Sequence, residues 1–158
     1  MEPLHTTTTV YSLDEYMKFN RYTVWILNKS LLSSLISIVL LFVLDILLNH
    51  KIVGVIAIYV LVTILLSLSI ESSAKKCYYS NKSGINEIST YHFFQNTITE
   101  LREAGTDTFV YNDLYRICET KEHFYLMISQ NKGIIIIKRE CTPELIAFIQ
   151  ELKRKYNK

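Results

Sequence analysis

Residues 31–48 read LLSSLISIVLLFVLDILL, and residues 52–70 read IVGVIAIYVLVTILLSLSI. Asp45 is the one charged residue of the first run, and the second run has none. Each run is close to the roughly 20 apolar residues that a helix needs to cross about 30 Å of hydrocarbon. Inside lipid every backbone polar group must be bonded within the protein, which favours helices over an open sheet. The sequence therefore predicts two membrane-spanning helices.

The two runs are separated by Asn49, His50 and Lys51, so the helices must return antiparallel as a hairpin with both chain ends on one side. Lysine and arginine near the ends of a span tend to stay in the cytoplasm. Lys51 lies in the turn, and six cations lie near the other ends of the spans: Lys18, Arg21, Lys29, Lys75, Lys76 and Lys82. We therefore expect a multi-pass protein of the plasma membrane with both termini in the cytoplasm.

Aromatic and basic residues flank the two runs on the expected cytoplasmic side. Amphipathic side chains of this kind favour the layer of lipid headgroups. The candidates for the membrane interface are Trp25, Lys29, Lys75, Lys76, Tyr78 and Tyr79.

Asp45 is the one polar residue within a span that suggests a function, because intramembrane carboxylates often belong to ion or proton pathways. It lies within one helical turn of Asn49, where its side chain can reach water or pair with Lys51. We favour this interfacial interpretation over a transport pathway.

Residues 1–30 form the expected cytoplasmic N-terminal segment. Ser12-Leu13-Asp14-Glu15 fits a capping box, in which the Ser12 hydroxyl and the Glu15 carboxylate each bind a free amide of the first turn. An amphipathic helix should begin at Leu13 and either lie along the membrane or, as we favour, continue into the first span, since neither Pro nor Gly interrupts residues 12–48. Residues 6–10 are β-branched and are equally compatible with disorder or with a strand added to a C-terminal sheet.

Residues 77–158 change to short apolar runs bounded by turn residues, which predicts a small antiparallel β domain. The expected strands are 91–94, 97–102, 108–111, 114–119, 123–129 and 133–139, of which 97–102 can also be read as helix. A final helix is marked by Thr142 as N-cap and Pro143 at the first helical position. Its apolar stripe should cover an open face of the sheet. The predicted fold is thus an α+β membrane protein, a helical hairpin (31–70) joined to a β domain closed by a C-terminal helix.

Strands closed by a C-terminal helix are typical of a pleckstrin-homology-like barrel, and nearly the whole chain resembles a YcxB-like membrane protein. The resemblance is carried by YSLDEYMKFNRYTVW (11–25) before the spans, and by FVYNDLYRICETKEHFYLMIS (109–129) followed by NKGIIIIKRECTPEL (131–145). It implies the architecture just described. It implies no common activity.

Reactive groups are sparse. Candidate zinc ligands are His92, Cys118, His123 and Cys141, whose spacing matches no zinc motif. A Cys118–His123 nucleophile pair lacks an orienting third group, and Glu119 and Glu122 flank a turn, as exposed carboxylates commonly do. The aromatic residues Tyr111, Tyr115, Phe124 and Tyr125 could line a ligand groove, but core packing explains them better. No glycine-rich phosphate motif is present. We expect no enzyme, no metal and no cofactor.

The net charge of +2 is too balanced to favour nucleic acid as a partner. The expected partners are the lipid bilayer and an unidentified membrane or cytoplasmic protein, and small residues in the spans would permit a homo-oligomer. The leading hypothesis is a membrane-anchored binding or adaptor module that recruits a protein or lipid at the inner membrane face. The alternative is an immunity protein that protects its host from a membrane-acting toxin or bacteriocin.

Overall fold

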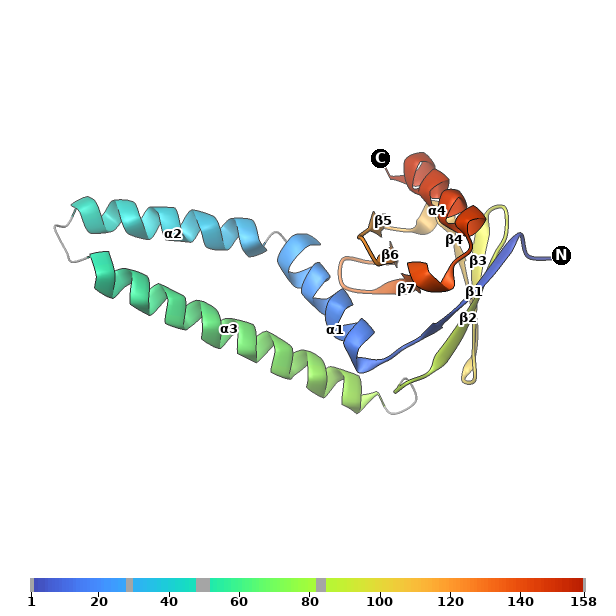
Figure 1. Ribbon diagram of the computed structural model, residues 1–158, viewed down its shortest axis with the longest axis horizontal. Coiled ribbons are helices and arrows are strands. Elements are labelled where there is room, and N and C mark those ends of the chain that lie inside the picture. The colour runs from blue at the N-terminus through green and yellow to red at the C-terminus, as the bar shows by residue number, and fades with distance from the viewer. Residues whose placement is uncertain (1, 28–29, 48–51, 82–84, 158) are drawn as a thin grey trace.

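The computed structural model describes residues 2–27, 30–47, 52–81 and 85–157, which form a long helical hairpin and a β domain (Figure 1). Helix α1 (Leu13–Tyr22) runs into a π-helical turn (Thr23–Leu27), and α2 (Ser30–Leu47) and α3 (Ile52–Ser80) make the hairpin. The predicted α+β class, with antiparallel sheets and a C-terminal helix, is confirmed.

The hairpin helices α2 and α3 are joined by a polar contact between their apolar surfaces. The Tyr59 hydroxyl lies 2.6 Å from Ser34 Oγ and donates to the Ser34 carbonyl at 2.8 Å. Among the described residues, one helical stretch, Ala57–Ser80, is long and apolar enough to cross a membrane, while Ile36–Leu47 is apolar but shorter. Helix α3 continues ten residues past the predicted end of the second span, because Ala74 and Tyr78 are buried in its last turns.

The first sheet contains β1 (His5–Val10), β2 (Ile88–Phe93), β3 (Thr97–Arg102) and β4 (Gly105–Val110), in that order and all antiparallel. Of the two alternatives for the N-terminal residues, the strand is the one observed: Thr7 pairs with Tyr91, and Thr7 and Thr9 are buried. The hairpin is therefore an insertion between two neighbouring strands of one sheet. Residues 97–102 form a strand and not a helix.

The second sheet contains β5 (Arg116–Glu119), β6 (His123–Met127) and β7 (Gly133–Ile137), also antiparallel. The Thr7 hydroxyl donates to the Glu140 carbonyl at 2.7 Å, which links β1 to the turn that follows β7. Helix α4 (Pro143–Tyr156) begins as predicted, with Thr142 Oγ1 accepting from the Leu145 amide at 3.3 Å.

The main core lies between the two sheets and α4. Its fully buried side chains include Phe93, Ile98, Tyr111, Phe124, Leu126, Ile136, Leu145 and Ile149. Alternate residues of β6 and β7 point the other way: Tyr125, Met127 and Ile135 form a smaller cluster with Phe19 of α1. Strand β7, whose sequence is GIIII, is therefore buried on both faces, because α4 covers one face and α1 covers the other.

Candidate functional site

Helix α1 is positioned by half of the predicted capping box. Ser12 Oγ accepts from the Glu15 amide at 3.3 Å, as expected. The reciprocal bond is absent, because the Ser12 amide donates to the Val10 carbonyl and the Glu15 carboxylate turns toward the second sheet. That part of the prediction is wrong, and it places a buried carboxylate against β6.

Glu15 and His123 form a buried polar pair between α1 and β6. Glu15 Oε2 lies 2.5 Å from His123 Nε2, and their side chains are 7% and 4% exposed. With the carboxylate ionised, the His123 Nε2–H is the donor. The His123 backbone is fixed by Thr120, whose hydroxyl accepts from the His123 amide at 2.9 Å. Both members of the pair are thus held by ordered backbone.

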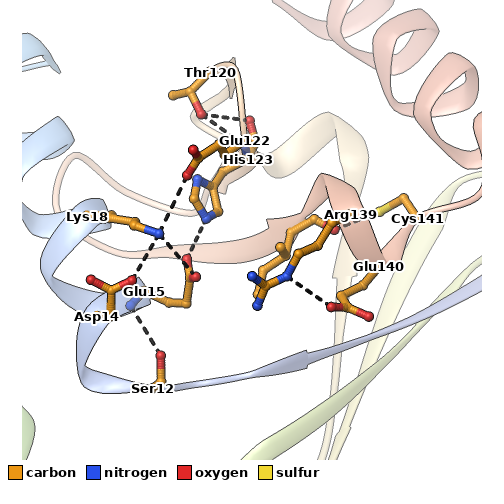
Figure 2. Close-up of polar contacts among 11 residues, drawn as sticks. Ser12, Asp14, Glu15, Lys18, Thr120, Glu122, His123, Arg139, Glu140 and Cys141 are labelled. Carbon is orange, nitrogen blue, oxygen red and sulfur yellow. Dashed lines mark hydrogen bonds and ion pairs between the residues drawn. The ribbon is translucent and has the colours of Figure 1, made fainter.

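Lys18 occupies the open side of this pair. Figure 2 shows its ammonium among three carboxylates, at 2.9 Å from Asp14, 3.5 Å from Glu15 and 3.5 Å from Glu122. The contact with Asp14, aided by the other two carboxylates, raises the pKa of Lys18. The cation thereby balances part of the negative charge around Glu15.

Aromatic packing completes the contact between α1 and the second sheet. The Tyr125 ring lies 5.3 Å from Phe19 and 5.0 Å from Tyr22, centroid to centroid, and the His123 ring stacks on Tyr125 at 5.5 Å. Burial raises the pKa of Tyr22 to about 12, so its hydroxyl stays protonated at neutral pH. Such aromatic contacts stabilise a fixed orientation beyond the area that they bury.

Two adjoining hollows, of about 420 Å³ and 400 Å³, open beside this contact, and we call them the α1 hollows. Both are lined by Lys18, Lys121, Glu122 and His123. The larger extends along α1 past Arg21 and Tyr22 to Ile26, and the smaller reaches the end of β7. Over both hollows the cations are Lys18, Arg21, Lys121, Lys138 and Arg139, and the carboxylates are Glu15 and Glu122. This lining suits an anion.

Most of these cations already have partners. Arg21 binds Glu71 of α3 at 2.7 Å, Lys138 binds Glu119 at 2.8 Å and Arg139 binds Glu140 at 3.1 Å. Lys121 is exposed in the turn between β5 and β6, and it has no ion pair or hydrogen bond within the described parts of the chain. It is therefore available to a ligand.

The residues predicted for the membrane interface lie in different settings. Lys75 and Lys76 are exposed and Tyr79 is 56% exposed, whereas Tyr78 is buried against α1 and donates from its hydroxyl to the Tyr11 carbonyl at 2.9 Å. Trp25 lies in the π-helical turn, and Lys29 is outside the described residues. Their contact with lipid stays a prediction.

Asp45 is only 4% exposed, although its neighbours in α2 are largely exposed. Neither of its carboxylate oxygens has a hydrogen-bond partner in the described part of the chain. Its expected partner Lys51 lies outside the described residues. The interfacial interpretation therefore stays a prediction.

The suggested metal and nucleophile residues are dispersed. His92 contacts Thr6, Cys141 donates to the Ile137 carbonyl, and Cys118 packs in the small cluster under α1, where burial raises the pKa of its thiol. Within residues 2–27, 30–47, 52–81 and 85–157, no group of three or more His, Cys, Asp or Glu side chains could hold a metal ion.

The remaining candidates also separate. Glu119 binds Lys138, Gln150 and Lys153, and these contacts, with Lys138 foremost, lower its pKa to about 2, whereas Glu122 binds Lys18. The two carboxylates therefore serve different partners. Of the four aromatic residues considered for a groove, Tyr111, Phe124 and Tyr125 are buried and Tyr115 is exposed.

Sequence reasoning did not associate Glu15 with His123. They are 108 residues apart, and the capping-box motif supplies a sufficient local reason for Glu15. A weak signal was available, since a histidine opening an apolar strand requires a polar partner when it is buried.

Comparison with known proteins gives one match. Residues 93–153 match the family model described as YcxB-like protein. No curated protein and no solved structure matches the chain. The matched segment runs from the end of β2 into α4, and it excludes β1, α1 and the hairpin. The match supports the similarity of this chain to the YcxB-like family, through its β domain.

Proposed function

We propose that the chain is a non-enzymatic, membrane-anchored binding module, in which the α2–α3 hairpin crosses the plasma membrane and the β domain lies at its cytoplasmic face. The observation that carries the proposal is the insertion of an apolar hairpin between β1 and β2 of one sheet.

The surface of the hairpin supports burial in lipid. Its exposed side chains are large and apolar, including Ile36, Val39, Leu40, Leu47, Ile58, Leu61, Leu65 and Leu68. A contiguous apolar surface of this kind is unfavourable in water and is typical of a surface buried against lipid or another protein. At 1.5 Å per residue, the 18 residues of α2 span about 27 Å, close to the thickness of bilayer hydrocarbon.

The longer α3 supports a fixed position for the β domain. Its 29 residues span about 43 Å, so its last turns extend beyond the hydrocarbon. There Glu71 binds Arg21 of α1, and Tyr78 binds the backbone just before α1. The β domain is therefore attached to both ends of the hairpin and not to one flexible linker, which suits a module that presents its surface near the headgroups.

The architecture also supports a finer likeness to pleckstrin-homology-like domains, because a four-stranded and a three-stranded sheet are closed by a C-terminal helix. No reaction is assigned to the module, since the reactive groups considered above bind separate structural partners.

Membrane integration and orientation test the proposal directly. The full chain should remain in membranes after alkaline carbonate extraction. A protease should digest the β domain in inside-out vesicles and leave it intact in right-side-out vesicles. Release of the chain by carbonate would contradict anchoring by the hairpin, and digestion in right-side-out vesicles would contradict the cytoplasmic position.

A further inference from the structure

We propose that the α1 hollows bind the phosphate of a net-anionic lipid headgroup. The inference rests on the proposed function, because it requires the β domain to lie at the membrane surface.

The charge of the lining carries the first step. Five cations and two carboxylates line the α1 hollows, and four of the cations are paired with carboxylates beside the lining: Lys18 with Asp14, Arg21 with Glu71, Lys138 with Glu119 and Arg139 with Glu140. Glu15 and Glu122, the two carboxylates of the lining, both contact Lys18. Among the described residues, the cation of this lining that no carboxylate balances is Lys121.

Lys121 supplies the second step. The other lining cations each contact a carboxylate, whereas Lys121 has no partner among the described residues and lies where both hollows meet. A phosphate placed there would gain a charge-assisted hydrogen bond without displacing an ion pair.

The position of the larger hollow favours a lipid over a soluble phosphate. Its wall continues from Arg21 through Tyr22 to Ile26, and Ile26 is 55% exposed just before α2 begins at Ser30. The larger hollow therefore opens where the chain would enter the bilayer. Its apolar side, formed by Tyr22 and Ile26, suits the glycerol backbone and the upper acyl chain of a bound lipid. Basic pockets on the cytoplasmic side of membrane helices have the required character for anionic headgroups.

A lipid titration tests this inference on the full chain. Phosphatidylglycerol or phosphatidylcholine is titrated into detergent micelles that contain the protein, and bound lipid is measured by native mass spectrometry. Phosphatidylglycerol should bind more tightly than phosphatidylcholine. Lys121→Gln should weaken phosphatidylglycerol binding by about fivefold, the usual contribution of one lysine near an anionic membrane surface.

Lys132→Gln is the matched control, because Lys132 is also an exposed turn lysine of the same sheet and its loss changes the net charge equally. Affinity should be unchanged in Lys132→Gln and retained in Lys121→Arg. Equal weakening in both glutamine variants, or equal binding of the two lipids, would overturn the inference.

A second arm identifies the source of the phosphate. Inorganic phosphate and glycerol phosphate are titrated against bound phosphatidylglycerol, and weak displacement by both supports the lipid. Displacement by inorganic phosphate at the affinity of the lipid would overturn the lipid assignment. Carbonate-resistant protein without lipid selectivity would refute the headgroup site alone, whereas carbonate-extractable protein would refute the proposed anchoring.

Discussion

Replacement of Glu15 by alanine should release α1 from the second sheet. The substitution removes the acceptor of a 2.5 Å hydrogen bond and leaves the His123 ring buried without its partner. A buried polar group that is left without its hydrogen-bond partner costs about 1–3 kcal/mol. The His123 side chain is only 4% exposed, so we place the loss at the upper end, about 3 kcal/mol. Glu15→Gln keeps an acceptor for Nε2–H and should lose only about 1 kcal/mol.

Thermal unfolding of the full chain in detergent measures these losses. For a chain of this length, each 1 kcal/mol lowers Tm by roughly 2–4 °C, so Glu15→Ala should lower Tm by roughly 6–12 °C. Asp14→Ala is the control on the same helix, because Asp14 is exposed and, among the described residues, contacts Lys18 alone; it should lose about 0.5 kcal/mol or less.

A double-mutant cycle tests whether the loss of stability in Glu15→Ala comes from the contact with His123. Glu15→Ala and His123→Ala should show a coupling free energy of about 1–3 kcal/mol, because each residue is the buried partner of the other. Losses in Glu15→Ala as small as those in Asp14→Ala, or additive losses in the double variant, would refute the assignment of this pair as the link between α1 and the second sheet.

Three further changes test the β domain. Asn157→Ala removes two hydrogen bonds, at 2.7 and 2.6 Å, that the side chain makes with the backbone of Ile117 at the edge of β5; hydrogen exchange of the Ile117 amide should accelerate, with a loss of about 1–2 kcal/mol. Glu119 has a pKa lowered to about 2, so its contribution to stability is present above the ordinary carboxyl pKa and is lost as the pH falls toward 2; Glu119→Gln should flatten this acid limb of a Tm-versus-pH curve. Gly133→Ala places a methyl 3.0 Å from a carbonyl oxygen and a sulfur of β6 and should cost about 1–3 kcal/mol in thermal unfolding, whereas Gly54→Ala, with open space around it, should not destabilise the chain.

The local signals in the sequence predicted most of the β domain. The N-cap and the apolar stripe of α4 predict that helix correctly, because both signals depend on neighbouring residues. The sequence does not decide whether β1 forms, for a physical reason. In HTTTTV the buried Thr7 and Thr9 and the exposed Thr6 and Thr8 are the same residue type, so the alternation of apolar and polar residues that marks a strand is not visible. Its partner β2 is also separated from it by the whole hairpin.

The Glu15–His123 pair could not be predicted from the sequence for a different reason. Glu15 satisfies a local motif, and its actual partner is set by the docking of α1 on Tyr125, which depends on the tertiary fold. The sequence does not distinguish Lys121 from other turn lysines, because a lysine in a turn is usually a solvated side chain. Its significance comes from the hollow that α1 creates around it, which no local pattern encodes.

The pairing of β1 with β2 constrains the membrane topology on its own. β1 precedes the hairpin and β2 follows it, and the two strands are hydrogen-bonded neighbours, so both must lie on one side of any membrane. If Ala57–Ser80 crossed the bilayer alone, α1 and β1 would be left on the face opposite to β2, and the first sheet could not form. A crossing by α3 therefore requires a crossing by α2. Under the proposed membrane anchoring, the two helices therefore insert together, and closure of the first sheet depends on their doing so.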